Sequence, residues 1–213
     1  NEVNPCIEAT DNYWINEAKK TWKEEDGRQK IHYSQQNKNK RPGSHSETID
    51  ARKFYEFYNS LDDRNIDIML EVKDKNLSAV KINNLIENNS IVELEKEWAR
   101  YKYLILENSP RVYNNIRKLL KDKNSYPVLK FYDFVDEALS LEFNPGYSVN
   151  AGQHVWGYFK NYEDDKLKEK VENQFQKIKE GSSSLALKSI LWKLSHDKDM
   201  NYLLDSLYFK DLM

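Results

Sequence analysis

Lys30-Ile31-His32-Tyr33-Ser34 and Ile66-Asp67-Ile68-Met69-Leu70-Glu71-Val72 are the two stretches that decide the fold of the first part of the chain. Both are short, apolar and bounded by polar loops, which is typical of strands. A helical pattern lies between them, with Thr48 or Asp50 as its N-cap, and a shorter helical pattern follows the second stretch. Strand, helix, strand and helix with long connections indicate a parallel α/β sheet whose strands are buried on both faces.

The rest of the chain shows helix signals only, and they begin directly after residue 89. Ser90 and Glu93 form a capping-box pattern before an amphipathic stretch, and Ser109-Pro110 supplies an N-cap and a first-turn proline for the next helix. We therefore expect an α/β part over residues 1–88 and an all-α, multi-helix domain over 90–213, with a predominantly helical chain overall. Further helices are expected at 126–141, 148–161, 164–180, 184–197 and 199–209.

The composition is that of a folded protein without a membrane span. Of the 213 residues, 39% are hydrophobic and 13% aromatic, which argues against disorder. No apolar run approaches the roughly 18 residues that a spanning helix needs. The formal net charge of −2 does not predict nucleic-acid binding through bulk charge. The single cysteine, Cys6, cannot form an internal disulfide, so the bacterial cytoplasm is the expected compartment.

Basic residues nevertheless gather in two places along the chain. One cluster lies in the loop that leads to His45, and the other follows Pro110 on a predicted helix. A solvated surface is the simpler interpretation of both. The clusters consist of Lys38, Lys40 and Arg41, and of Arg111, Arg117, Lys118, Lys121 and Lys123.

Polar residues within the two strands are the clearest sign of chemistry. Lys30 and His32 leave the same face of the first strand, Glu71 lies near the end of the second, and His45 follows the intervening loop. A buried charge without a partner costs several kcal/mol, so these side chains need partners. Imidazole and carboxylate groups together suit a divalent transition metal such as Mn or Zn. A buried structural ion-pair network explains the same residues equally well.

Three stretches of the first part resemble the last two strands of the UV damage endonuclease family. They are Gln29 to Gln35, the pair Ser44-His45, and Asp67 to Lys75. The resemblance implies a TIM barrel, of which residues 1–88 supply the last two strand-helix units. It also implies an enzyme that nicks DNA on the 5′ side of ultraviolet photoproducts with a cluster of divalent metals, typically manganese, with zinc or magnesium as alternatives and no nucleotide or organic cofactor.

The same resemblance gives a role to each polar residue. By position, His32, His45 and Glu71 match metal ligands, and Lys30 matches a lysine beside the metals that is reported as carboxylated in this family. Next to such a site, four basic side chains are candidates for contacts with DNA phosphates. They are Lys38, Lys40, Arg41 and Lys73.

The resemblance also implies that a large part of the enzyme precedes this chain. The family's other ligands, and the residues that probe damaged bases, lie on six strands that would come before Asn1. We expect the chain to be the C-terminal part of a metal-dependent phosphodiester hydrolase that acts on UV-damaged double-stranded DNA as the full-length protein. Without the missing N-terminal barrel portion it is not expected to cleave DNA. No membrane partner is expected.

The helical part resembles the YbgA-type helical domain, whose function is uncharacterised. The resemblance lies in residues 98–102, 108–110, 150–160, 202–204 and 208–209. A hydrogen-bonded histidine at a helix contact is a simpler interpretation of its central motif than a ligand or a catalyst. The alternative function for the chain is a non-catalytic helical module that binds DNA or protein. The motif consists of Gln153, His154, Gly157 and Tyr158.

Overall fold

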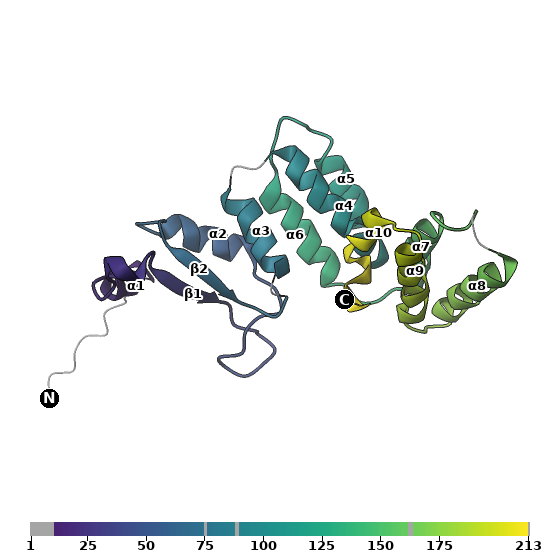
Figure 1. Ribbon diagram of the computed structural model, residues 1–213, viewed down its shortest axis with the longest axis horizontal. Coiled ribbons are helices and arrows are strands. Elements are labelled where there is room, and N and C mark those ends of the chain that lie inside the picture. Colours follow the sequence, from purple (N-terminus) through teal and green to yellow (C-terminus); the bar gives the residue numbers. More distant parts are fainter. Residues whose placement is uncertain (1–10, 75, 88–89, 162–163, 213) are drawn as a thin grey trace. The chain divides into compact units, whose positions relative to one another are not determined.

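The computed structural model (Figure 1) describes residues 11–74, 76–87, 90–161 and 164–212. Cys6 and Lys75, which entered the expectations above, lie outside these residues. The chain divides into two compact units, Asn1–Asn88 (unit 1) and Asn89–Met213 (unit 2). None of the described helices is both long and apolar enough to cross a membrane.

Unit 1 alternates helices with two strands that pair in parallel. Lys30 lies opposite Asp67 and Ser34 lies opposite Glu71, so both strands begin and end together. Asp50 is the N-cap of the intervening helix, because its side chain accepts hydrogen bonds from the next backbone N–H groups. The elements are α1 (Asp11–Lys19), η1 (Glu24–Asp26), β1 (Lys30–Ser34), α2 (Ala51–Ser60), β2 (Asp67–Glu71) and α3 (Asn76–Ile86).

One face of this sheet is covered, and the other is open in the part of the chain that the structure describes. On the covered face, the ring of Tyr33 packs 5.0 Å from Phe54 and 4.7 Å from Phe57 of α2, measured between centroids, and α3 packs beside α2. On the other face Lys30, His32 and other polar residues are exposed. The expectation that both faces are buried is therefore wrong for these residues, because the two helices that follow the strands cover one side only.

Unit 2 contains helices only, as expected for its described residues. Helix α4 packs against α5, α6, α7 and η2 and so lies at the centre of the unit. The elements are α4 (Ile91–Asn108), α5 (Pro110–Leu119), α6 (Val128–Leu139), α7 (Pro145–Trp156), α8 (Asp165–Lys179), α9 (Leu185–Asp197), α10 (Asn201–Leu204) and η2 (Leu207–Leu212). The prediction of a small α/β part followed by a predominantly helical chain is confirmed.

Two local expectations in unit 2 are wrong. The Ser90 side chain makes no capping hydrogen bond, and the side chain of Glu93, the other half of the proposed capping box, accepts a hydrogen bond from Lys96 (2.7 Å). Helix α7 begins at Pro145 rather than near 148, because the Asn144 side chain accepts the hydrogen bond of the Tyr147 N–H and caps the helix there.

One hydrophobic core cluster of unit 2 lies where α4, α7, α8, α9 and η2 meet. Gly152 of α7 marks the closest approach: a Cβ atom there would lie 2.7 Å from Leu187 of α9 and 2.9 Å from Phe175 of α8. Both distances are below van der Waals contact, so only glycine allows α7 to sit this close to its neighbours. Helix α7 thus packs closely against α8 and α9 at Gly152.

Candidate functional site

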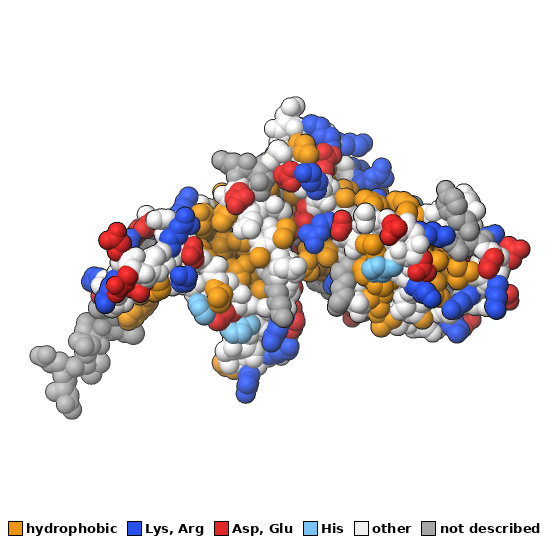
Figure 2. All heavy atoms as spheres, in the orientation of Figure 1, with side chains coloured by type: hydrophobic (Ala, Val, Ile, Leu, Met, Phe, Trp, Pro, Cys, Tyr) orange, Lys and Arg blue, Asp and Glu red, His pale blue; other side chains and the backbone are white. Residues whose placement is uncertain are grey.

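Three of the predicted site residues meet at the C-terminal end of the sheet in unit 1. His32 Nδ1 lies 2.6 Å from Glu71 Oε1, and His45 Nε2 lies 3.5 Å from Glu71 Oε2. The carboxylate of Glu71 thus lies between two imidazoles, one on each oxygen. Figure 2 shows histidine and acidic side chains gathered on this surface of unit 1.

The register of the strands and the loop after β1 bring these side chains together. Glu71 is the last residue of β2, and His32 lies in the middle of β1, two residues before Ser34, which is the register partner of Glu71. The loop then folds back on itself, with an antiparallel bridge between Gln36 and His45 and a hydrogen bond from the Ser46 N–H to the Gln35 carbonyl (2.8 Å). A further hydrogen bond, from the Lys73 N–H to the Ser46 carbonyl (3.2 Å), ties this loop to the end of β2. His45 is therefore held beside Glu71 by backbone pairing.

The cluster is open to solvent. The side chains of His32, His45 and Glu71 are 59%, 41% and 36% exposed. The interactions among them are consequently worth at most about 1 kcal/mol each in water. The cluster therefore does not explain the stability of unit 1, and its groups can take other partners without a large loss of folding energy.

The donor set fits a divalent transition metal but is incomplete. Two imidazole nitrogens and two carboxylate oxygens are the ligand types that Mn or Zn accepts. Within residues 11–74, 76–87, 90–161 and 164–212, however, no three His, Cys, Asp or Glu side chains are placed so that they could hold a metal ion. The three residues here could supply part of a coordination shell, and the remaining ligands would have to come from elsewhere.

The structure does not bring Lys30 into this cluster. Its side chain leaves the same open face of β1 as His32, but its ammonium lies 6.0 Å from the centroid of the Trp22 ring. Lys30 is exposed, so its charge needs no buried partner. Lys30 therefore lies on the same face of the sheet as His32 but does not contact the cluster.

The four candidates for phosphate contacts differ in how their charges are used. Lys40 pairs with Glu47 at 2.9 Å. The side chains of Lys38, Arg41 and Lys73 are exposed, and among the described residues no carboxylate pairs with them. These three cations flank the His32–Glu71–His45 cluster along the chain and are free to meet an anion.

The motif of unit 2 is split between surface and interior. Gln153 and His154 are exposed on α7, and His154 has no hydrogen-bond partner among the described residues, contrary to the expected hydrogen-bonded histidine. Gly157 is the C-cap of α7. The Tyr158 hydroxyl is hydrogen-bonded to Tyr103 of α4 (2.8 Å), and burial together with this bond raises the pKa of Tyr103. Only Tyr158 therefore has a defined packing role.

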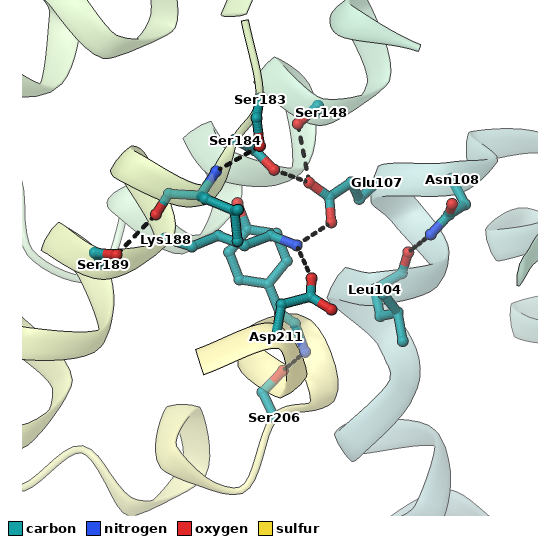
Figure 3. Close-up of polar contacts among 12 residues, drawn as sticks. Leu104, Glu107, Asn108, Ser148, Ser183, Ser184, Lys188, Ser189, Ser206 and Asp211 are labelled. Carbon is teal, nitrogen blue, oxygen red and sulfur yellow. Dashed lines mark hydrogen bonds and ion pairs between the residues drawn. The ribbon is translucent and has the colours of Figure 1, made fainter. Parts of the chain in front are cut away.

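A buried polar network in unit 2 was missed by sequence reasoning (Figure 3). Lys188 Nζ of α9 lies 2.7 Å from Glu107 Oε2 of α4 and 3.4 Å from Asp211 Oδ2 of η2. The other Glu107 oxygen accepts hydrogen bonds from Ser148 (2.9 Å) and Ser184 (2.8 Å). One signal could have revealed it: Lys188 falls on the same helical face as buried leucines of α9.

Comparison with known proteins finds two families along the chain. The family UV-endonuclease UvdE matches residues 4–102, and the family Protein of unknown function (DUF1722) matches residues 102–211. A UV DNA damage endonuclease of Clostridium perfringens (strain 13 / Type A) is 39% identical over 125 residues, which cover 56% of this chain and 29% of that protein. The chain therefore spans less than a third of that relative's length. No solved structure matches the chain.

Proposed function

The chain belongs to the DUF1722 family through residues 102–211 and matches the UV-endonuclease UvdE family through residues 4–102, and from this premise we propose that it is part of a UV damage endonuclease. The complete enzyme hydrolyses a phosphodiester bond on the 5′ side of ultraviolet photoproducts in double-stranded DNA. Unit 1 supplies some of its metal ligands and is inactive without the rest of the enzyme.

The single observation that supports this proposal best is the meeting of His32, His45 and Glu71 at one end of the sheet. Strand ends of this kind are where active sites form in α/β barrels. The two imidazoles and the carboxylate come from different elements, yet the loop pairing holds them on one surface. The match to the family UV-endonuclease UvdE over the same residues supports DNA as the substrate proposed for this surface.

In the proposed site, His32, His45 and Glu71 would supply part of the ligand shell of a divalent metal, and Mn fits these donors. A metal held there would supply Lewis-acid polarisation of the scissile phosphate and would activate water as the nucleophile. Glu71 orients both imidazoles, and Lys38, Arg41 and Lys73 hold neighbouring phosphates through charge-assisted hydrogen bonds. Lesion-containing pairs cost less to unstack than intact ones, which favours damaged DNA as the substrate.

The open face of the sheet supports the proposal that more of the enzyme packs here. Met69, in the middle of β2, is 59% exposed on the same face as Lys30 and His32. We propose that the N-terminal barrel portion covers this face and contributes the missing ligands. Lys30 would then lie beside the metals, where a carbamate on its amine would replace a positive charge by a negative one.

The test is the Glu71→Gln variant of the complete enzyme, assayed for nicking of irradiated duplex in the presence of Mn. We expect the rate to fall about 100-fold. The neutral amide of glutamine lacks the negative charge with which Glu71 would bind the metal and pair with His32 and His45. Glu56→Gln is the matched control, since Glu56 is exposed on α2 and away from the cluster. Undiminished nicking by Glu71→Gln would remove Glu71 from the site.

A further inference from the structure

A basic groove crosses the surface of unit 2 along α4, α5 and the turn after α5. It encloses about 690 Å³ and is lined by Glu95, Trp98, Asn114, Arg117, Lys118, Leu120, Lys121 and Lys123. Between residues 111 and 123, five side chains are basic and one, Asp122, is acidic. Lys and Arg side chains gather over the region of α5 in the space-filling view (Figure 2). The groove is thus strongly positive on a chain whose net charge is slightly negative.

Three of these cations are not neutralised within the described residues. Lys123 pairs with Glu95, and Arg111 pairs with Glu137. Arg117, Lys118 and Lys121 are exposed, and no carboxylate among the described residues pairs with any of them. These three side chains are therefore available to an external anion.

The acidic groups near the groove are already occupied. Glu95 is held by Lys123. Asp122 accepts a hydrogen bond from the Asn124 N–H (3.0 Å), and this bond, with one from Ser125, keeps the pKa of Asp122 below its usual range. Asp122 is engaged with the backbone of its own turn, and the four cations that line the groove outnumber Glu95 and Asp122. The unbalanced charge of the groove remains positive.

The helix dipole accounts for only part of the cluster. Arg117 and Lys118 lie in the last turn of α5, where cations interact favourably with the free carbonyl groups. Lys123 lies beyond the helix and donates a hydrogen bond to the carbonyl of the C-cap Leu120 (2.7 Å). Lys121 also lies beyond the helix, and among the described residues its side chain has no such bond. Helix α8 offers a contrast, because its lysines are interleaved with Asp165, Glu169 and Glu172. Acidic residues are thus distributed among the lysines of α8, whereas no acidic residue lies between Arg111 and Lys121.

One aromatic side chain, Trp98, lines the groove and is supported by packing from outside it. Trp98 of α4 packs against Tyr113 of α5, with ring centroids 5.2 Å apart, and the guanidinium of Arg117 lies 5.7 Å from the Tyr113 ring. Leu120, which also lines the groove, is buried. A DNA backbone presents anionic phosphates and apolar sugar surfaces in alternation, so it can use both the cations and the Trp98 side chain of this groove.

We propose that this groove binds the phosphate backbone of duplex DNA and gives the enzyme a second contact with its substrate, outside the metal site. The choice of DNA as the polyanion rests on the proposed function. Backbone contacts carry no sequence or lesion information, so the groove binds irradiated and plain duplex equally. Contacts of this kind give dissociation constants of about 10⁻⁴ to 10⁻⁶ M at physiological salt and weaken steeply as salt rises.

The experiment measures binding of the complete 213-residue chain to a short duplex over a series of salt concentrations. Lys118→Glu/Lys121→Glu should weaken binding at least about tenfold at low salt and reduce the salt slope by about 2, one for each lost phosphate contact. Lys166→Glu/Lys170→Glu is the matched control, because it makes the same charge change on exposed lysines of α8. Lys118→Arg/Lys121→Arg should bind like the unchanged chain.

Several outcomes would overturn the proposal. Absence of binding by the unchanged chain at low salt would do so, and so would an equal loss in the groove and control variants, since that indicates bulk charge alone. Tighter binding to duplex RNA than to duplex DNA would replace the proposed partner.

The substituted side chains are all exposed, so the variants should have the same midpoint of thermal unfolding as the unchanged chain, which excludes misfolding as the cause of weaker binding. The nicking assay of Glu71→Gln tests the metal site of unit 1, and the salt dependence of binding tests the groove of unit 2. Failure of one proposal is therefore distinguishable from failure of the other.

Discussion

Two glutamates, Glu71 in unit 1 and Glu107 in unit 2, each lie at the centre of a polar cluster, and their surroundings are opposite. Glu71 is partly exposed between two imidazoles. Glu107 is buried, and its two oxygens are taken by Lys188 and by the hydroxyls of Ser148 and Ser184 (Figure 3). An occupied, buried carboxylate has no capacity for a ligand. An exposed carboxylate whose partners can exchange is able to bind a ligand. The burial of the carboxylate therefore distinguishes the structural cluster around Glu107 from the candidate site around Glu71.

The network around Glu107 ties together parts of unit 2 that are distant in sequence. Glu107 comes from α4, Ser148 from α7, Lys188 from α9 and Asp211 from η2. Taking such charges out of water is costly, and the cost is recovered only while the partners stay together. The network therefore stabilises one arrangement of four elements and disfavours any other.

The largest expected effect follows from removing one buried charge. Lys188→Met should lower the free energy of unfolding by about 3–5 kcal/mol, because the carboxylate of Glu107 stays buried without its cation. Urea unfolding of the chain measures this change. Lys193→Met is the matched control, since Lys193 is exposed on the same helix, and it should change the free energy by less than about 0.5 kcal/mol. Similar values for both variants would show that the network is not needed for stability.

The next effect concerns the tyrosine beneath Lys188. The Tyr208 hydroxyl is buried without a hydrogen-bond partner among the described residues, and burial, aided by Glu107, raises the pKa of Tyr208 well above its usual value. The folded state therefore keeps a proton that the unfolded state loses above about pH 10, so this contribution to stability is present below that pH and is lost as pH rises further.

Tyr208→Phe should accordingly make alkaline unfolding less steep. At neutral pH it should be neutral or stabilising by about 1 kcal/mol, because it removes an unsatisfied hydroxyl. Thermal unfolding from pH 8 to 11 measures both effects. Tyr147→Phe, a change at an exposed tyrosine of α7, should leave the pH dependence unaltered. A stability loss above about 1 kcal/mol at pH 7 for Tyr208→Phe would mean that the hydroxyl has a partner.

The smallest effect is expected in unit 1. Glu71→Gln should change the free energy of unfolding of the chain by less than about 1 kcal/mol, because exposed ion pairs contribute little. Glu107→Gln makes the same chemical change in the buried network and should cost clearly more. The two variants are compared by urea unfolding under one set of conditions. If Glu71→Gln were the more damaging, the exposed cluster would be a structural element and the contrast between the two glutamates would fail.

The sequence was sufficient for elements whose patterns are local. The spacing of apolar residues and the Asp50 cap predicted the order of strands and helices in unit 1, and alternation along β1 placed His32 on one face with Lys30. Their exposure could not be predicted, because it depends on what covers the sheet. The Glu107–Lys188 pair was missed because it joins two helices far apart in sequence, and periodicity shows which face a lysine takes but not its partner.

Helix α4 also bears on how this gene could be cut and recombined. The two family matches meet at residue 102, in the middle of α4, whereas the compact units divide at Asn88 and Asn89. Expression of residues 102–211 alone would remove the first half of the helix, including Leu94 and Tyr101, which are buried in unit 2. A version of unit 2 for separate expression or fusion should therefore begin before Ser90, so that it contains the whole of helix α4.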